Sequence, residues 1–256
     1  MMKPEYESSW DSFFANIDDK IGSIRSDLGL INIAPFTAYN KVICLEIKLN
    51  IPREDGLSSS EESDILFKIE EAITRILENK LEAVFAGAET TDSKRRFYFY
   101  CHDITLYDKF ISDEMIKFPS YEFEFSDWED IKWDTYLKFL YPSDEDLQRM
   151  GNRNVIENLE ERGDDLKTPR EVIHWIYFKL KENRTKFITK ISSDGFTIEE
   201  LEKHSEDSNF GLLISRIEDV DLDNIDEVVL KLFRLAKECN GGYDGWETQI
   251  IMSNAE

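Results

Sequence analysis

The sequence predicts an α+β protein built from two tandem ferredoxin-like domains, each an antiparallel sheet with its helices on one face. Apolar residues alternate in several short segments, as in half-buried strands, and recur at helical spacing in others. The element order β-α-β-β-α-β can be read twice along the chain, and this is the order of the ferredoxin-like fold. With 256 residues, of which 41% are hydrophobic, the chain is long enough for two cores.

The first half begins with an added hairpin over residues 10–30 that turns near Asp18 and Asp19. Residues 42–49 then alternate as a strand, and Ser59 with Glu62 three positions later forms the capping box of a helix. Further strands are expected at 82–88, 95–102 and 121–125, a short helix at 106–116, and one more edge strand at 133–140.

A boundary is expected near Pro142, which divides the chain into domains 1–142 and 143–256. The second domain opens with an extra helix at about 146–162 and then repeats the order of the first. Its strands are expected at 172–179, 196–203, 210–217 and 243–251, and its helices at 182–193 and 224–239.

The composition favours a soluble protein whose partners are basic. The formal net charge is −23, and acids exceed bases in both halves, so the field of the molecule opposes direct binding of nucleic acid and attracts cationic partners. Cys44, Cys101 and Cys239 lie far apart in apolar runs, which predicts buried thiols in a reducing compartment. The N-terminus has no apolar signal core and no apolar run is long enough to cross a membrane, so we expect a cytoplasmic protein.

The most distinctive motif is Tyr243-Asp244-Gly245-Trp246-Glu247, which follows an amphipathic helix and begins the last expected strand. Together with residues 222–240, the run 155–161, the turn 163–165 and the strand 172–178, it resembles the family of B-type regulators of ribonuclease E activity (RraB). In the first half, residues 94–100 and the order of elements are similar to a bacterial domain family of unknown function. That second resemblance implies no activity.

The RraB resemblance implies a protein without catalytic activity that binds an endoribonuclease of the ribonuclease E type, or an RNA-degradation assembly, and restrains it. An acidic protein would be attracted to the basic, arginine-rich segments that RNA-processing enzymes carry. We expect the contacts to be acids at the start of one helix together with the motif of the last strand: Glu218, Asp219, Asp221, Asp223, Tyr243, Asp244, Trp246 and Glu247. For Trp246 and Tyr243 a role in packing is as well supported as a role in binding.

Three other groups of residues suggest chemistry but are better explained by structure. Cys101-His102-Asp103 has the residue types of a nucleophilic triad, yet neighbouring strand residues face opposite ways. His174 lies in an apolar strand, and we expect it to be a hydrogen-bonded sheet residue. Asp219, Asp221, Asp223 and Glu227 have part of the spacing of a calcium loop but lack its glycine and closing glutamate, so helix capping is the better interpretation. No metal or cofactor is therefore expected.

One basic and aromatic cluster remains, formed by Arg95 and Arg96 with Tyr98 and Tyr100. Strands of this kind can stack RNA bases, but the net charge opposes it, so we expect the arginines to pair with acids and the tyrosines to pack in the sheet. Two alternatives to a ribonuclease regulator stay open: an immunity or antitoxin protein against a basic nuclease, and a first domain that is an enzyme or a sensor of a small ligand.

Overall fold

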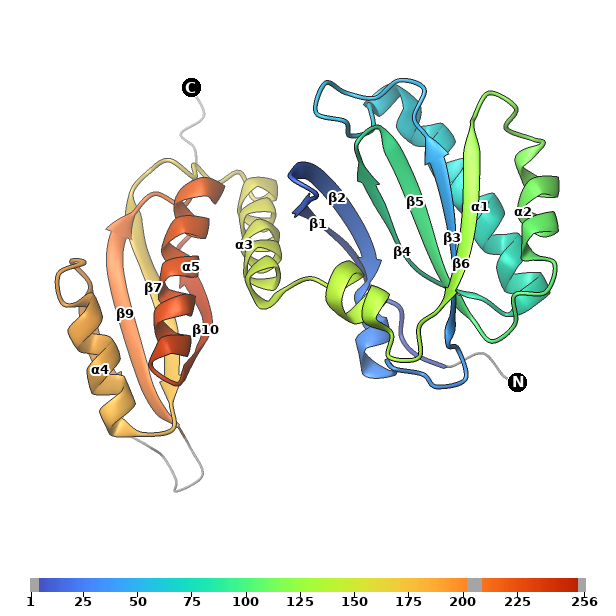
Figure 1. The fold of residues 1–256 in the computed structure, drawn as a ribbon. Coiled ribbons are helices and arrows are strands. Elements are labelled where there is room, and N and C mark those ends of the chain that lie inside the picture. The colour runs from blue at the N-terminus through green and yellow to red at the C-terminus, as the bar shows by residue number, and fades with distance from the viewer. Residues whose placement is uncertain (1–4, 202–208, 253–256) are drawn as a thin grey trace. The chain divides into compact units, whose positions relative to one another are not determined.

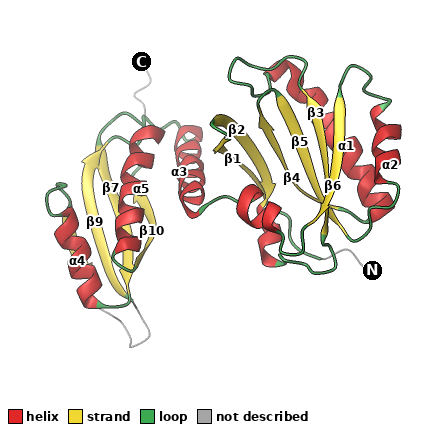
Figure 2. Cartoon of the chain, viewed as in Figure 1, coloured by secondary structure: helices red, strands yellow, loops and turns green. Residues whose placement is uncertain are grey.

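The computed structural model describes residues 5–201 and 209–252. The chain forms two compact units, residues 1–143 and 144–256, each of which is described by itself (Figure 1). Each unit contains one antiparallel sheet and helices, which confirms the expected α+β class (Figure 2).

The first unit is built on a six-stranded sheet in the order β1-β2-β4-β5-β3-β6. The expected N-terminal hairpin is present, with Asp18 and Asp19 in the left-handed conformation at its turn. The strands are β1 (Trp10–Ile17), β2 (Lys20–Asp27), β3 (Lys41–Lys48), β4 (Val84–Thr91), β5 (Lys94–Cys101) and β6 (Phe123–Glu129). The helices are η1 (Leu28–Asn32), α1 (Ser60–Leu81), α2 (Tyr107–Met115) and η2 (Tyr136–Leu140).

One face of this sheet packs against α1 and α2. Alternate residues of β3 and β5, among them Ile43, Leu45, Phe97 and Phe99, form a core with the apolar stripe of α1. The capping box expected at the start of α1 does not form, because the Ser59 side chain makes no capping hydrogen bond. The carboxylate of Glu62 accepts hydrogen bonds from the backbone N–H groups of Asn50 and Ile51 instead.

The second face of the first sheet is also covered, and here one expectation was wrong. Residues 133–140 do not form an edge strand; most of them lie in short helical turns that end in η2. Trp133, Tyr136 and Leu140 are spaced by three and four residues, which is the helical period, and all three are fully buried. The carboxylate of Asp130 accepts hydrogen bonds from the N–H groups of Asp134 and Thr135 and so caps the segment.

The second unit has a four-stranded sheet in the order β10-β7-β9-β8. Its strands are β7 (Arg170–Phe178), β8 (Thr197–Leu201), β9 (Phe210–Glu218) and β10 (Gly241–Thr248), and its helices are α3 (Asp144–Glu161), α4 (Lys181–Ile191) and α5 (Leu222–Glu238). The strand expected at 196–203 is present as β8, while residues 202 and 203 lie outside the described residues.

Among the described residues of this unit, the core is formed on one face of the sheet. Along β7 the buried residues alternate with half-buried or exposed ones, and Val172, Ile176 and Phe178 face the core with residues of α3, α4 and α5. Ile173, Trp175 and Tyr177 point to the other face and are only half-buried. The two sheets therefore differ in how their second faces are used.

Candidate functional site

The acids expected to bind a partner lie where β9 ends and α5 begins. Asp221 is the N-cap of α5, and its carboxylate accepts a hydrogen bond from the N–H of Asn224 at 3.0 Å. The side-chain amide of Asn224 also donates to Asp219 at 2.8 Å. The capping role expected for these acids is confirmed for Asp221, while Asp223 is exposed in the first turn, where it complements the helix dipole.

Glu218 belongs to a buried polar chain that reaches the motif of the last strand. The ring of His174 is fully buried, its Nδ1 lies 2.9 Å from the hydroxyl of Tyr243, and its Nε2 lies 3.5 Å from Glu218. Arg216 pairs with the other oxygen of Glu218 at 2.8 Å. The expectation that His174 is a hydrogen-bonded sheet residue is confirmed, and this histidine links Glu218 to Tyr243 inside the core.

The pKa values of two groups in this chain are shifted by their surroundings. Burial raises the pKa of Tyr243, and the nearby negative charge of Glu218 adds to this. Burial also disfavours ionisation of Glu218, but the contacts with His174 and Arg216 outweigh it and hold the pKa of Glu218 below its usual value of 4.5. Glu218 is thus ionised and neutralised internally, which leaves it little charge to offer a partner.

Trp246 connects the last strand to α3. Its indole Nε1 donates to the side-chain oxygen of Asn152 at 2.8 Å, and the amide of Asn152 donates in turn to Asp226 of α5 at 2.7 Å. The ring is half-buried against the core. A β-bulge between Tyr243 and Gly245 allows both aromatic residues of the motif to face the core.

The residues of the motif are therefore divided between core and surface. Tyr243 and Trp246 face inward, whereas Asp244 and Glu247 are exposed. An open hollow of about 410 Å³ is lined in part by Tyr243 and Asp244, and a separate one of about 510 Å³ lies where β9 ends, lined in part by Glu218 and Asp219. Across the sheet Asp244 lies in the bulge opposite Trp175 and Ile176 of β7, whereas Glu218 pairs with Arg170 at the start of that strand, so these two acids are not neighbours.

A surface that the sequence analysis missed lies on the second face of this sheet. We call it the open sheet face, and its apolar centre consists of Ile173, Trp175, Tyr177, Leu213 and Ile217, all half-buried or exposed. The cross-strand pairs Ile173–Glu247 and Leu213–Glu199 place two exposed acids on the same face, and Glu171 is a third. The sequence did carry a signal for this face. The residues of β7 that alternate with the core residues are apolar at Ile173, Trp175 and Tyr177, and two of these three are aromatic.

Comparison with known families agrees with this division into two units. A model described as "Family of unknown function (DUF695)" matches residues 8–141, and one described as "Regulator of ribonuclease activity B" (RraB) matches residues 149–248. The chain belongs to the DUF695 family, and its second half is an RraB domain. Both resemblances seen in the sequence are confirmed.

The other comparisons add little. No curated protein matches. A solved structure described as that of a glycine cleavage system transcriptional repressor is 8% identical, over 82% of this chain and 98% of its own, with a TM-score of 0.22. A likeness at that level supports no argument about this protein.

In the DUF695 domain the triad residues are not assembled. Cys101 is buried on the face of Phe97 and Phe99, as expected, and burial raises the pKa of its thiol to about 12. His102 and Asp103 are exposed, and the carboxylate of Asp103 accepts a hydrogen bond from the hydroxyl of Thr105 at 2.7 Å. A protonated, buried thiol is a poor nucleophile.

The basic and aromatic cluster of the DUF695 domain is used internally. Arg95 pairs with Glu70 at 3.0 Å, and Arg96 with Glu46 and Glu89, each at 2.6 Å. The hydroxyls of Tyr98 and Tyr100 donate to Glu89 and Asp130, at 2.6 and 2.7 Å. The prediction of paired arginines and packed tyrosines is confirmed. Within the described ranges, no helix has the length and apolar character needed to cross a membrane.

Proposed function

We propose that this protein is a cytoplasmic regulator without catalytic activity, whose RraB domain binds an endoribonuclease of the ribonuclease E type and restrains it. The observation that carries the proposal is the match of residues 149–248 to the regulators of ribonuclease activity. The net charge of −23 supports a basic protein partner over direct RNA binding, because the same field that attracts arginine-rich segments repels phosphates.

The open sheet face is the surface we assign to this contact. Tryptophan and tyrosine are frequent energetic centres of protein interfaces, and Trp175 and Tyr177 lie next to each other on alternate positions of β7. The surrounding carboxylates of Glu171, Glu199 and Glu247 would attract a cationic segment and orient it.

The residues expected from the sequence have two roles in this proposal. Asp219, Asp223, Asp244 and Glu247 are partly or fully exposed; Glu247 lies on the open sheet face, and the other three would contact the partner where it extends beyond that face. The remaining four would position them from inside the domain: Glu218, Asp221, Tyr243 and Trp246.

We also infer that both domains, residues 1–142 and 143–256, have ferredoxin-like topology. The order β10-β7-β9-β8 in the second sheet and β4-β5-β3-β6 within the first support this inference, as does the antiparallel pairing of every neighbouring strand. In each set the first and third strands in sequence lie at the centre.

The test combines capture and inhibition. The tagged full chain is incubated with host lysate at low and high salt, with and without nuclease treatment, and recovered proteins are identified by mass spectrometry. The purified enzyme is then assayed for RNA cleavage with increasing amounts of the full chain. We expect capture of a ribonuclease that is lost at high salt and unaffected by nuclease, and slower cleavage.

Matched charge reversals locate the contact. Glu247 lies on the open sheet face and Glu160 on the exposed side of α3. Substituting either glutamate by lysine changes the net charge by the same amount. We expect Glu247→Lys to weaken binding about tenfold and Glu160→Lys less than twofold. Equal effects would refute the assigned surface, whereas capture that needs RNA would refute direct binding. Recovery of a toxin nuclease in place of a ribonuclease would favour the immunity alternative.

A further inference from the structure

The sheet of the DUF695 domain is wider than the layer of helices that covers its first face. Trp10, Phe14 and Ile21 lie on the α1 side of the β1–β2 hairpin, because they alternate with residues of the opposite face and share their side with Arg25. Their exposed fractions are 37%, 63% and 44%. The hairpin thus carries an apolar shelf next to α1.

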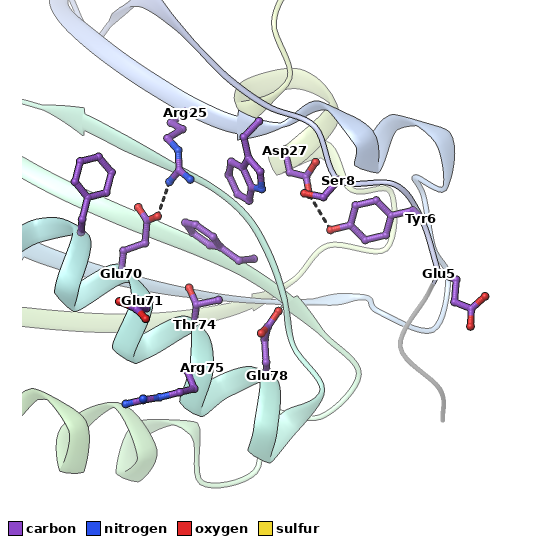
Figure 3. Close-up of a pocket in the computed structure, with 13 residues that line it drawn as sticks. Glu5, Tyr6, Ser8, Arg25, Asp27, Glu70, Glu71, Thr74, Arg75 and Glu78 are labelled. Atoms are coloured by element: carbon purple, nitrogen blue, oxygen red, sulfur yellow. Dashed lines mark hydrogen bonds and ion pairs between the residues drawn. The ribbon is translucent and has the colours of Figure 1, made fainter.

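Between this shelf and α1 lies a groove of about 790 Å³ (Figure 3). Phe67, Glu71, Thr74 and Glu78 line it from α1, at spacings of three and four residues that place them on one side of the helix. This stripe differs from the one that packs in the core, which contains Leu66, Ile69, Ile73 and Leu77. At the far end the groove is bordered by Tyr6, whose hydroxyl donates to Asp27 at 2.8 Å.

The groove already holds one guanidinium group of its own. Arg25 lies with its guanidinium 4.4 Å from the ring of Trp10 and 6.0 Å from that of Phe67, and it forms an ion pair with Glu70. This combination of aromatic faces and a carboxylate is a known way to bind a cationic side chain. The chemistry of the lining is therefore suited to lysine and arginine.

The rest of the groove repeats this chemistry with an excess of negative charge. Among the residues that the structure describes, five carboxylates and two arginines line it, and the guanidinium of the second arginine, Arg75, lies 3.8 Å from Glu114 of α2. Glu71 is exposed and makes no ion pair with any residue that the structure describes.

We propose that this groove of the DUF695 domain binds a basic amphipathic helix of a partner protein. Apolar residues of that helix would cover Trp10, Phe14 and Phe67, and a lysine or arginine of it would pair with Glu71. The helix would complete the layer formed by α1 and α2 over the β1–β2 end of the sheet. A second copy of this chain is disfavoured as the occupant, because two molecules of charge −23 repel each other.

The test uses a model peptide because the partner is unidentified. A fluorescein-labelled peptide of about 18 leucine and lysine residues, with leucines on one helical face, is titrated with the full chain and followed by fluorescence anisotropy. A peptide of the same composition in scrambled order has the same charge but no apolar face. We expect the amphipathic peptide to bind at least about tenfold more tightly than the scrambled one.

Two pairs of variants distinguish the groove from general attraction to an acidic protein. Phe67→Ala is matched by Ile65→Ala, since both positions are exposed on α1 and only Phe67 lines the groove. Glu71→Lys is matched by Asp113→Lys on the exposed side of α2. We expect each groove variant to weaken binding about five- to tenfold and each control less than twofold. Thermal unfolding checks that all four variants fold.

Several outcomes would overturn the proposal. Equal losses in matched variants, or equal binding of both peptides, would mean that charge alone attracts the peptide. Sedimentation that shows a dimer abolished by Phe67→Ala would identify a second copy as the occupant. The proposal does not depend on a ribonuclease, so its failure leaves the function proposed for the RraB domain untouched.

Discussion

The two sheets of this protein differ most in their second faces. In the DUF695 domain that face is closed by the helical turns of residues 133–140, whose Trp133 stacks on Tyr100 with ring centres 4.0 Å apart. In the RraB domain the corresponding face carries Trp175 and Tyr177 half-exposed. Aromatic residues at alternate positions of a central strand are thus buried and stabilising in the DUF695 domain, whereas in the RraB domain they remain partly exposed to solvent.

The comparison shows that the residue pattern of a strand does not by itself indicate whether one or both of its faces are buried. Both β5 and β7 present aromatic residues on two sides, and burial depends on whether a later segment returns to cover them. In the first domain the covering segment comes immediately after the last strand. In the second domain the described helices α3, α4 and α5 contribute their buried residues to the core on the other face.

The largest effect is expected from removing the tryptophan that closes the first sheet. Trp133→Ala would create a cavity on the second face and remove the hydrogen bond from the indole to the carbonyl of Tyr39. We expect the free energy of unfolding of the DUF695 domain to fall by about 3–5 kcal/mol. Urea unfolding followed by circular dichroism measures it; a loss below about 1 kcal/mol would show that the turns of residues 133–140 are not part of the core.

A smaller effect is expected from the buried polar chain of the RraB domain, in which His174 lies between Glu218 and Tyr243. The described histidine of the DUF695 domain, His102, is exposed instead. Glu218→Gln would remove the charge that Arg216 compensates and alter the contact with His174, and we expect a loss of about 1–3 kcal/mol at neutral pH. Because the pKa of Glu218 is lower in the folded than in the unfolded protein, its stabilising contribution is full above the usual value of 4.5. It disappears as the pH falls through the lowered folded value.

Unfolding of the wild type and of Glu218→Gln is therefore compared at several pH values. The difference between them should shrink as the pH decreases below 4.5. A difference that is constant over the acid range would mean that the carboxylate is not stabilised by ionisation. Glu227→Gln, the same change at an exposed position further along α5, serves as the control and should change stability by less than about 0.5 kcal/mol.

Much of the fold could be predicted from the sequence because local patterns determine it. The strands at residues 42–49 and 210–217 follow from alternation, and the helix beginning after Asp221 follows from capping and helical spacing. The segment 133–140 was misassigned because its length and aromatic content suit a strand, while its contacts with Tyr39 and Tyr100 favour a helix. Such tertiary contacts leave no local signal.

The candidate site was predictable only in part, for a similar reason. The sequence correctly indicated a capping role for Asp221 and a structural role for His174. It could not show that Tyr243 and Glu218 lie on either side of His174, since they are separated by long stretches of chain. Nor could it show that no helix of the described second domain covers Trp175, because that depends on the direction in which α3, α4 and α5 pack.

The smallest effect on stability, and the sharpest test of the comparison, is expected from Trp175→Ala. This ring is half-buried on the open sheet face, so we expect the RraB domain to lose less than about 1 kcal/mol, far below the loss for Trp133→Ala. Capture of the ribonuclease should nevertheless weaken about tenfold or more, because truncating an aromatic centre of an interface costs at least about 1–2 kcal/mol. A large loss of stability with unchanged capture would instead place Trp175 in a core like that of Trp133. The second faces of both sheets would then be buried, and the two domains would differ only in which part of the chain covers that face.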